Sequence, residues 1–151
     1  MSITWTPKTV VLEGHAKGKY DEETAGGAIT PGHLIDTNSD GEVVVHPTAG
    51  GYAERKVAIE DALQGQSTGL LGKGIDDAYA ADDKVRIYYA LPGDKLYMLL
   101  KDGEVATPAS FLSSNGDGTL QVVAGAEIPL FKSTESVSPS GAVGRIRVRA
   151  L

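Results

Sequence analysis

The chain has 151 residues, a formal net charge of −6 and no cysteine. This length corresponds to one domain, and the lack of cysteine excludes disulfides, thiolate catalysis and cysteine-based zinc sites. The acidic charge argues against nucleic acid as a direct partner, because phosphate binding requires a basic surface. No apolar run approaches the roughly 18 residues of a membrane-spanning helix, so we expect no membrane partner. Because the chain has no cysteine, we expect synthesis in the cytoplasm.

Residues 1–25 differ from the rest of the chain, because a few apolar side chains precede a polar run, KGKYDEETAGG. An isolated extended segment does not bury such side chains alone, but it can add to an exposed sheet edge. We therefore expect an extended N-terminal arm that docks on a partner chain. The alternative is that Trp5 lies in the first strand of the body itself. The predicted partner-binding residues of the arm are Ile3, Trp5, Val10, Val11 and Leu12.

Residues 26–151 are predicted to form a β-rich domain. Short apolar or β-branched runs alternate with turn residues about every ten positions, which is typical of a small β-barrel or sandwich. The fold class that we expect is therefore all-β. The runs that carry this prediction are AITPGHLI (28–35), EVVVH (42–46), VRIYYA (85–90), LYMLL (96–100), LQVV (120–123) and RIRVRAL (145–151).

The segment DTNSDGEVVVHP, residues 36–47, matches the start of a calcium-binding loop. Asp36, Asn38, Asp40 and Gly41 occupy the first ligand positions and the glycine position of that pattern. However, Pro47 stands where the loop requires a bidentate Glu, and residues 43–45, where a helix should begin, are three valines. We therefore predict a β-turn rather than a metal site, since Asp, Asn and Gly tolerate the backbone angles of a turn.

Two further segments are predicted from turn and strand signals. SSNGDGTL, residues 113–120, contains two hairpin dipeptides and lacks the Lys and helix of a phosphate-binding loop. AERKVAIEDAL, residues 53–63, is compatible with a helix or with a central strand that places Val57 and Ile59 on one side. We favour the strand, because its surroundings are β and Gly65 ends the segment quickly.

The last seven residues alternate basic and apolar side chains with period two, as a half-buried strand does. We expect Ile146 and Val148 to face inward. The outward arginines are candidates for contact with an acidic neighbour across a subunit boundary. These arginines are Arg145, Arg147 and Arg149.

The histidines and the acidic pairs of the chain lack the spacing of a catalytic or metal centre. His15, His33 and His46 lie far apart, and the acidic pairs are adjacent residues, which point to opposite faces of a strand. We therefore expect no enzymatic activity, no catalytic residue, no metal ligand and no cofactor.

A set of short segments, each of turn chemistry beside a strand, follows a defined order along residues 28–151. In this order the set resembles the small decoration (cement) proteins of tailed-bacteriophage heads. The segments are AITPGHL (28–34), His46 with AGG (49–51), AIED (58–61) with LQG (63–65), DAY (77–79) with Lys84-Val85, PGD (92–94), Leu112 with SNGDGTL (114–120), and RIRV (145–148).

The resemblance implies a β-tulip-like body that forms a homotrimer at local three-fold axes on the outside of a capsid. There it would clamp neighbouring major capsid subunits against the pressure of packaged DNA, without catalytic residue, cofactor or metal. The region before residue 28 matches least, so the expectation that neighbouring decoration trimers meet through the N-terminal arm comes from the arm itself. The alternative is a ligand-binding β-barrel module, for example for carbohydrate, although no aromatic cluster in the sequence indicates such a site.

Overall fold

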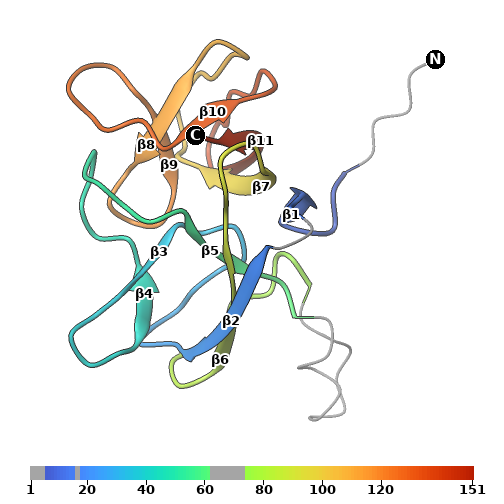
Figure 1. Ribbon diagram of the computed structural model, residues 1–151. Helices are drawn as coiled ribbons and strands as arrows, with labels where there is room; N and C mark the ends of the chain where they lie inside the picture. Colours follow the sequence, from blue (N-terminus) through green and yellow to red (C-terminus); the bar gives the residue numbers. More distant parts are fainter. Residues whose placement is uncertain (1–5, 16–17, 62–73) are drawn as a thin grey trace.

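The computed structural model describes residues 6–15, 18–61 and 74–151. These ranges contain 11 strands and no helix, so the predicted all-β class is confirmed. Among the described residues there is accordingly no helix with the length and apolar character to cross a membrane. The strands form two units, a barrel and a smaller sheet with a hairpin, which appear in the upper and lower halves of Figure 1.

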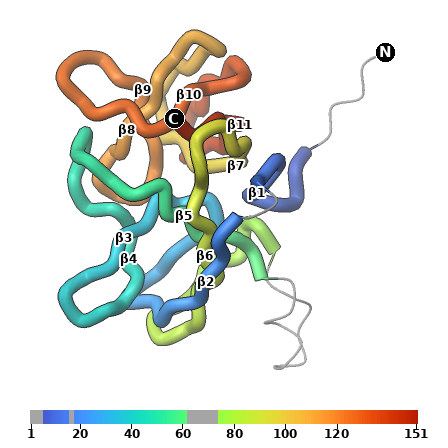
Figure 2. Tube along the Cα trace, viewed as in Figure 1, coloured from blue at the N-terminus to red at the C-terminus, as the bar shows by residue number. Residues whose placement is uncertain are grey.

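Five strands close into the barrel. β7 is followed across the sheet by β11, β10, β8 and β9, and β9 returns to β7 through the parallel pair Leu120 and Leu100. The tube in Figure 2 shows the same wall drawn from yellow to red, so the barrel is built from the C-terminal part of the chain. The bounds are β7 (Lys95–Leu100), β8 (Phe111–Ser114), β9 (Leu120–Val122), β10 (Phe131–Ser133) and β11 (Gly144–Ala150).

Side chains fill the interior of this barrel. Successive residues of a strand point to opposite faces, so every second residue of each barrel strand faces inward. Ile146 and Val148 follow this rule, which confirms the predicted register of the C-terminal strand. The inward residues with no exposed surface include Leu96, Met98, Leu100, Leu112, Leu120, Phe131, Ile146 and Val148.

The smaller unit consists of a three-stranded antiparallel sheet and a two-stranded hairpin with a core of their own. Ile29, Tyr79 and Ile87 are fully buried in that core, and the Tyr79 hydroxyl donates to the Ile59 carbonyl over 2.7 Å. The sheet has the order β2 (Lys19–Thr24), β6 (Lys84–Tyr89) and β5 (Lys56–Ile59), and the hairpin is β3 (Ile35–Thr37) with β4 (Val43–Val45).

Strand β5 connects the two cores, and the strand prediction for this segment is confirmed. Val57 and Ile59 pack in the barrel core, whereas Ala58, between them, packs in the core of the smaller unit. A strand covered on both faces is apolar at successive positions, which explains why its pattern was ambiguous between strand and helix. Residues 62 and 63 of that segment lie outside the described residues.

The two turn predictions are confirmed. Asn38 Oδ1 accepts hydrogen bonds from the backbone N–H groups of Asp40 and Glu42 at 3.0 and 2.9 Å, and Gly41 adopts a φ of 80°. The oxygen that a calcium loop would offer to a metal therefore closes the β3–β4 turn. Strands β8 and β9 likewise form an antiparallel hairpin, with Gly118 at a φ of 86°.

The N-terminal segment differs from the predicted arm in its described part. β1 (Val11–Glu13) pairs with β7, and β2 pairs with β6 along all six of its residues. Val10 has no exposed surface and belongs to the barrel core. Burial of this side chain and satisfaction of the backbone by β7 and β6 explain why these residues pack within the body rather than as a separate arm.

Candidate interaction surface

The outer wall of the barrel carries a row of basic side chains from three adjacent strands. Lys132 of β10 lies opposite Arg149 of β11, which lies opposite Lys95 of β7. Each alternates with buried neighbours, so all three point outward. We call Lys95, Lys132 and Arg149 the basic wall. Phe111 of β8, which is 43% exposed, lies opposite Lys132 at one end, and Glu13 of β1 lies opposite Lys95 at the other.

Of the three arginines predicted to reach a partner, two have partners in their own chain. Arg145 forms an ion pair with Asp76 at 3.1 Å, and its side chain is only 12% exposed. Arg147 forms an ion pair with Glu135 at 2.7 Å. Arg149 is exposed and forms no ion pair among the described residues. The structure therefore leaves Arg149 as the arginine best placed to contact a neighbour.

The predicted contact residues of the arm are separated by the structure. Val10 is buried, and its backbone N–H donates to Glu60 Oε2 over 2.9 Å while its carbonyl accepts from Tyr97 N–H over 2.7 Å. These bonds leave Val10 no surface for a partner. Val11 and Leu12 are half-buried on β1, and Ile3 and Trp5 lie outside the described residues.

A carboxylate, a tyrosine and a histidine meet at the turn between β6 and β7. Asp94 is 2% exposed; Oδ2 accepts from the Tyr88 hydroxyl at 2.5 Å and from Leu91 N–H at 2.9 Å, and Oδ1 is hydrogen-bonded to His15 Nδ1. Burial alone would raise the pKa of Asp94, but these hydrogen bonds hold it below its usual value. Burial, together with Asp94, raises the pKa of Tyr88 to about 12. The cluster ties the β1–β2 connection to the barrel and leaves no carboxylate oxygen open to a substrate.

The other two histidines also bind backbone or hydroxyl groups inside the fold. Burial lowers the pKa of His33 to about 4, and its Nδ1 accepts from Thr30 N–H over 3.0 Å. His46 is 3% exposed, with Nδ1 at 2.7 Å from Ser114 Oγ and Nε2 at 3.1 Å from the Tyr52 carbonyl. This buried Ser–His pair, with its second nitrogen bound to a carbonyl, connects the segment after β4 to the end of β8 and presents no nucleophile at the surface.

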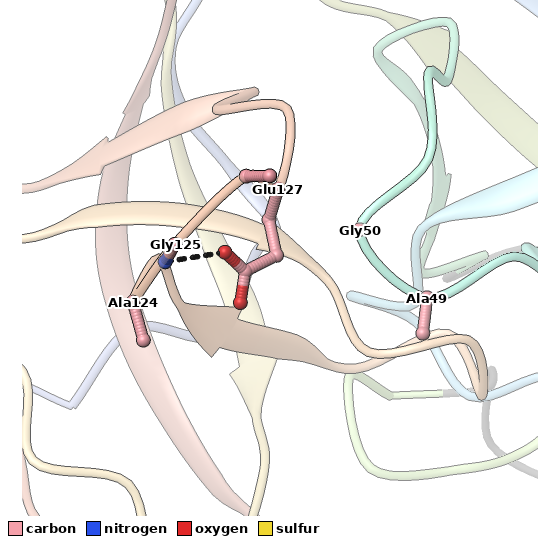
Figure 3. A pocket seen from close by; sticks show the side chains of 6 residues that line it. Ala49, Gly50, Ala124, Gly125 and Glu127 are labelled. Carbon is pink, nitrogen blue, oxygen red and sulfur yellow. Dashed lines mark hydrogen bonds between the residues drawn. The ribbon is translucent and has the colours of Figure 1, made fainter.

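Among the described residues, no three His, Cys, Asp or Glu side chains are grouped as metal ligands would be. A hollow lies between the loop after β4 and the loop after β9, and Figure 3 shows it from close by. Ala49, Gly50, Ala124 and Gly125 line it, with Glu127 as a single carboxylate. Glu127 Oε2 accepts from Gly125 N–H over 2.6 Å, so this carboxylate folds back onto its own loop. The hollow is shallow and lacks converging polar groups.

Sequence reasoning found Arg149 but missed Lys95, Lys132 and Phe111. The sequence did indicate that these side chains point outward, because each stands next to a buried apolar residue in a strand. What was missing was the pairing of β8, β10, β11 and β7, since register between distant strands is not a property of any one strand.

No protein-family model matches the chain, and no curated protein matches its sequence. The functional assignment therefore depends on the residues and on the surface that they form.

Proposed function

We propose that this chain is a decoration protein of a tailed-bacteriophage head. It binds the outside of the capsid as a homotrimer at local three-fold axes and cements neighbouring major capsid subunits. The ordered resemblance of residues 28–151 to such proteins supports this proposal, and the all-β barrel is compatible with the fold that the resemblance implies.

The observation that carries the proposal is the filled barrel. A five-stranded barrel is narrower than the eight-stranded barrels whose interior is just wide enough to hold side chains or one small ligand. Here Met98, Phe131 and Ile146 are among the fully buried side chains of the barrel core. The groups that could do chemistry, such as Asp94 and His46, are held by internal hydrogen bonds. What the described chain offers to other molecules is therefore its outer surface.

The same observation weighs against the alternative of a carbohydrate-binding barrel. Sugar recognition uses a concave site with a few converging polar groups and aromatic side chains. The hollow of Figure 3 is lined by small side chains and one carboxylate. Tyr52, which is 69% exposed, follows this lining in sequence but is not part of it. A contact surface between proteins fits these residues better.

The decisive experiment is co-sedimentation of the purified protein with isolated empty shells of the virus that encodes it. We expect saturable binding at three copies per local three-fold axis, and shells that withstand heat better when the protein is bound. An unrelated acidic protein of similar mass serves as the control. Absence of binding, or binding no greater than that of the control, would refute the proposal.

A further inference from the structure

We propose that the basic wall of one copy docks against the outer edge of strand β2 in a second copy. We call that edge, with Tyr20, Asp21 and Glu22, the acidic edge. The inference deepens the proposed function, because it rests on the self-association proposed there and identifies the two surfaces that meet. It follows from the strand pairing and from the distribution of charge along the chain.

The basic wall lowers the stability of an isolated folded chain. Like charges directly opposite each other on adjacent strands are destabilising, and Lys132, Arg149 and Lys95 form two such pairs in a row. Only Lys95 has a carboxylate partner among the described residues, Glu13 at 3.1 Å, and both side chains of that pair are exposed. Such a solvent-exposed pair contributes little to stability. Folding alone therefore does not account for this arrangement, whereas an acidic partner surface does.

The β8 end of the wall also carries two residue types that are enriched at interfaces. The Nζ atom of Lys132 lies 5.3 Å from the centre of the Phe111 ring, and this ring is 43% exposed. Interfaces between proteins are enriched in aromatic and arginine side chains, which contribute a large share of the binding energy. Phe111 and Arg149 supply one of each, separated by Lys132.

The chain itself carries the complementary charge. Residues 18–91, which include the smaller unit, contain 13 acidic and six basic residues, a net charge of −7. Residues 92–151, which include the barrel, contain six of each and are neutral. The basic wall therefore lies on the neutral unit, and every copy presents an acidic unit that can neutralise it.

Strand β2 is the part of the acidic unit best suited to this contact. It ends the three-stranded sheet, and among the described strands it pairs only with β6. Asp21 and Glu22 are exposed, Tyr20 is 53% exposed, and all three line a shallow hollow with Arg86. If two copies paired through their β2 edges, acidic side chains would face acidic side chains. This repulsion disfavours pairing between two β2 edges. A cationic surface is the partner that this edge favours.

The contact is heterologous, because the two surfaces are different parts of the molecule. Such contacts close into rings when the rotation between copies allows it. A three-membered ring formed in this way would have the symmetry of the proposed capsid position.

The test compares charge-reversed variants by sedimentation equilibrium over a range of protein concentrations, in about 0.05 M and about 0.5 M NaCl. We expect the wild-type protein to associate and the higher salt to weaken the association. The double variants Lys132→Glu/Arg149→Glu and Asp21→Lys/Glu22→Lys should each raise the dissociation constant at least about tenfold. The quadruple variant that combines them keeps the net charge of the wild type and should regain association.

Controls separate this contact from a general effect of charge. Lys101 is exposed beyond the end of β7 and lies outside the basic wall. Lys101→Glu should therefore leave the average molar mass in sedimentation unchanged, whereas Arg149→Glu should lower it. Circular dichroism verifies that each variant is folded. If the charge reversal of the basic wall unfolds the protein, Lys132→Gln/Arg149→Gln takes its place. A monomeric wild type, unchanged mass after reversal, or a folded quadruple variant without association would each overturn the inference. Loss of shell binding with intact, charge-dependent association would instead refute the decoration function alone.

Discussion

The ring of His33 packs against the turn between β8 and β9, where Gly118 leaves room for it. A Cβ atom at Gly118 would lie 3.0 Å from two ring atoms of His33. This packing removes the ring from water, and burial is the main cause of its lowered pKa. The charge of Asp117 partly opposes this effect, and the charge of Arg145 lowers the pKa further. The neutral imidazole is thus part of the native packing, with Nδ1 as acceptor for Thr30 N–H.

We predict that His33 makes stability fall as pH decreases from 6.5 to about 4. The folded-state pKa, about 4, lies below the ordinary histidine value of about 6.5, so the unfolded state binds the proton first and is stabilised relative to the folded state as pH falls. At about 1.4 kcal/mol per unit, the loss amounts to roughly 3 kcal/mol. Urea unfolding at a series of pH values measures it. His33→Asn keeps an acceptor and does not titrate, so its stability should fall less over this range; equal slopes would contradict the assignment.

A second prediction at this scale concerns the faces of β11. Ile146→Ala removes a fully buried side chain from the barrel and should cost about 2–5 kcal/mol of unfolding free energy. Arg147→Ala removes a partly exposed ion pair with Glu135 and should cost about 1 kcal/mol or less. Urea midpoints of the two variants decide the matter. Similar midpoints would mean that the strand faces are assigned wrongly.

At the scale of elements, β1 determines where a removable N-terminal segment ends. Its residues pair with β7, and Val10, directly before it, is buried in the barrel core. Burial of a valine contributes about 1.5–3 kcal/mol relative to exposure. The part of the segment that could act as an arm in the proposed function therefore precedes residue 10, and the predicted anchors Ile3 and Trp5 fall in that part.

We predict that two deletions at this end behave differently. Deletion of residues 2–6 removes Ile3 and Trp5 but keeps β1, so the melting temperature should stay within a few degrees while shell binding weakens. Deletion of residues 2–13 removes Val10 and β1 as well and should lower the melting temperature markedly. Calorimetry and shell co-sedimentation provide the two readouts. A shorter deletion that unfolds the protein would place Trp5 in the body, as the alternative interpretation of the sequence holds.

At the scale of the whole molecule, the barrel and the smaller unit are joined through shared strands. β5 contributes Val57 and Ile59 to one core and Ala58 to the other. β6 likewise contributes Tyr88 to the barrel core and Ile87 to the second. Neither unit is complete without these strands, so the two cores depend on the same backbone.

We therefore predict a single cooperative unfolding transition. Far-ultraviolet circular dichroism and hydrogen exchange at β7 and at β2 should report the same free energy of unfolding. Val57→Ala, a change in the barrel core, should lower protection of β2 as much as protection of β7. Protection that falls only at β7 would show that the units unfold separately.

What the sequence by itself determined are the features that depend on neighbours along the chain. Asn38 and Gly41 predicted the β3–β4 turn because their backbone angles are a local matter, and the alternation of RIRVRAL predicted which side chains of β11 face inward because period two is intrinsic to a strand. The tertiary structure alone decided the order β7-β11-β10-β8-β9, the burial of Val10, and the alignment of Lys95, Arg149 and Lys132 in one row. These depend on hydrogen bonds between strands distant in sequence, and many registers satisfy the same local pattern until packing of the shared core selects one.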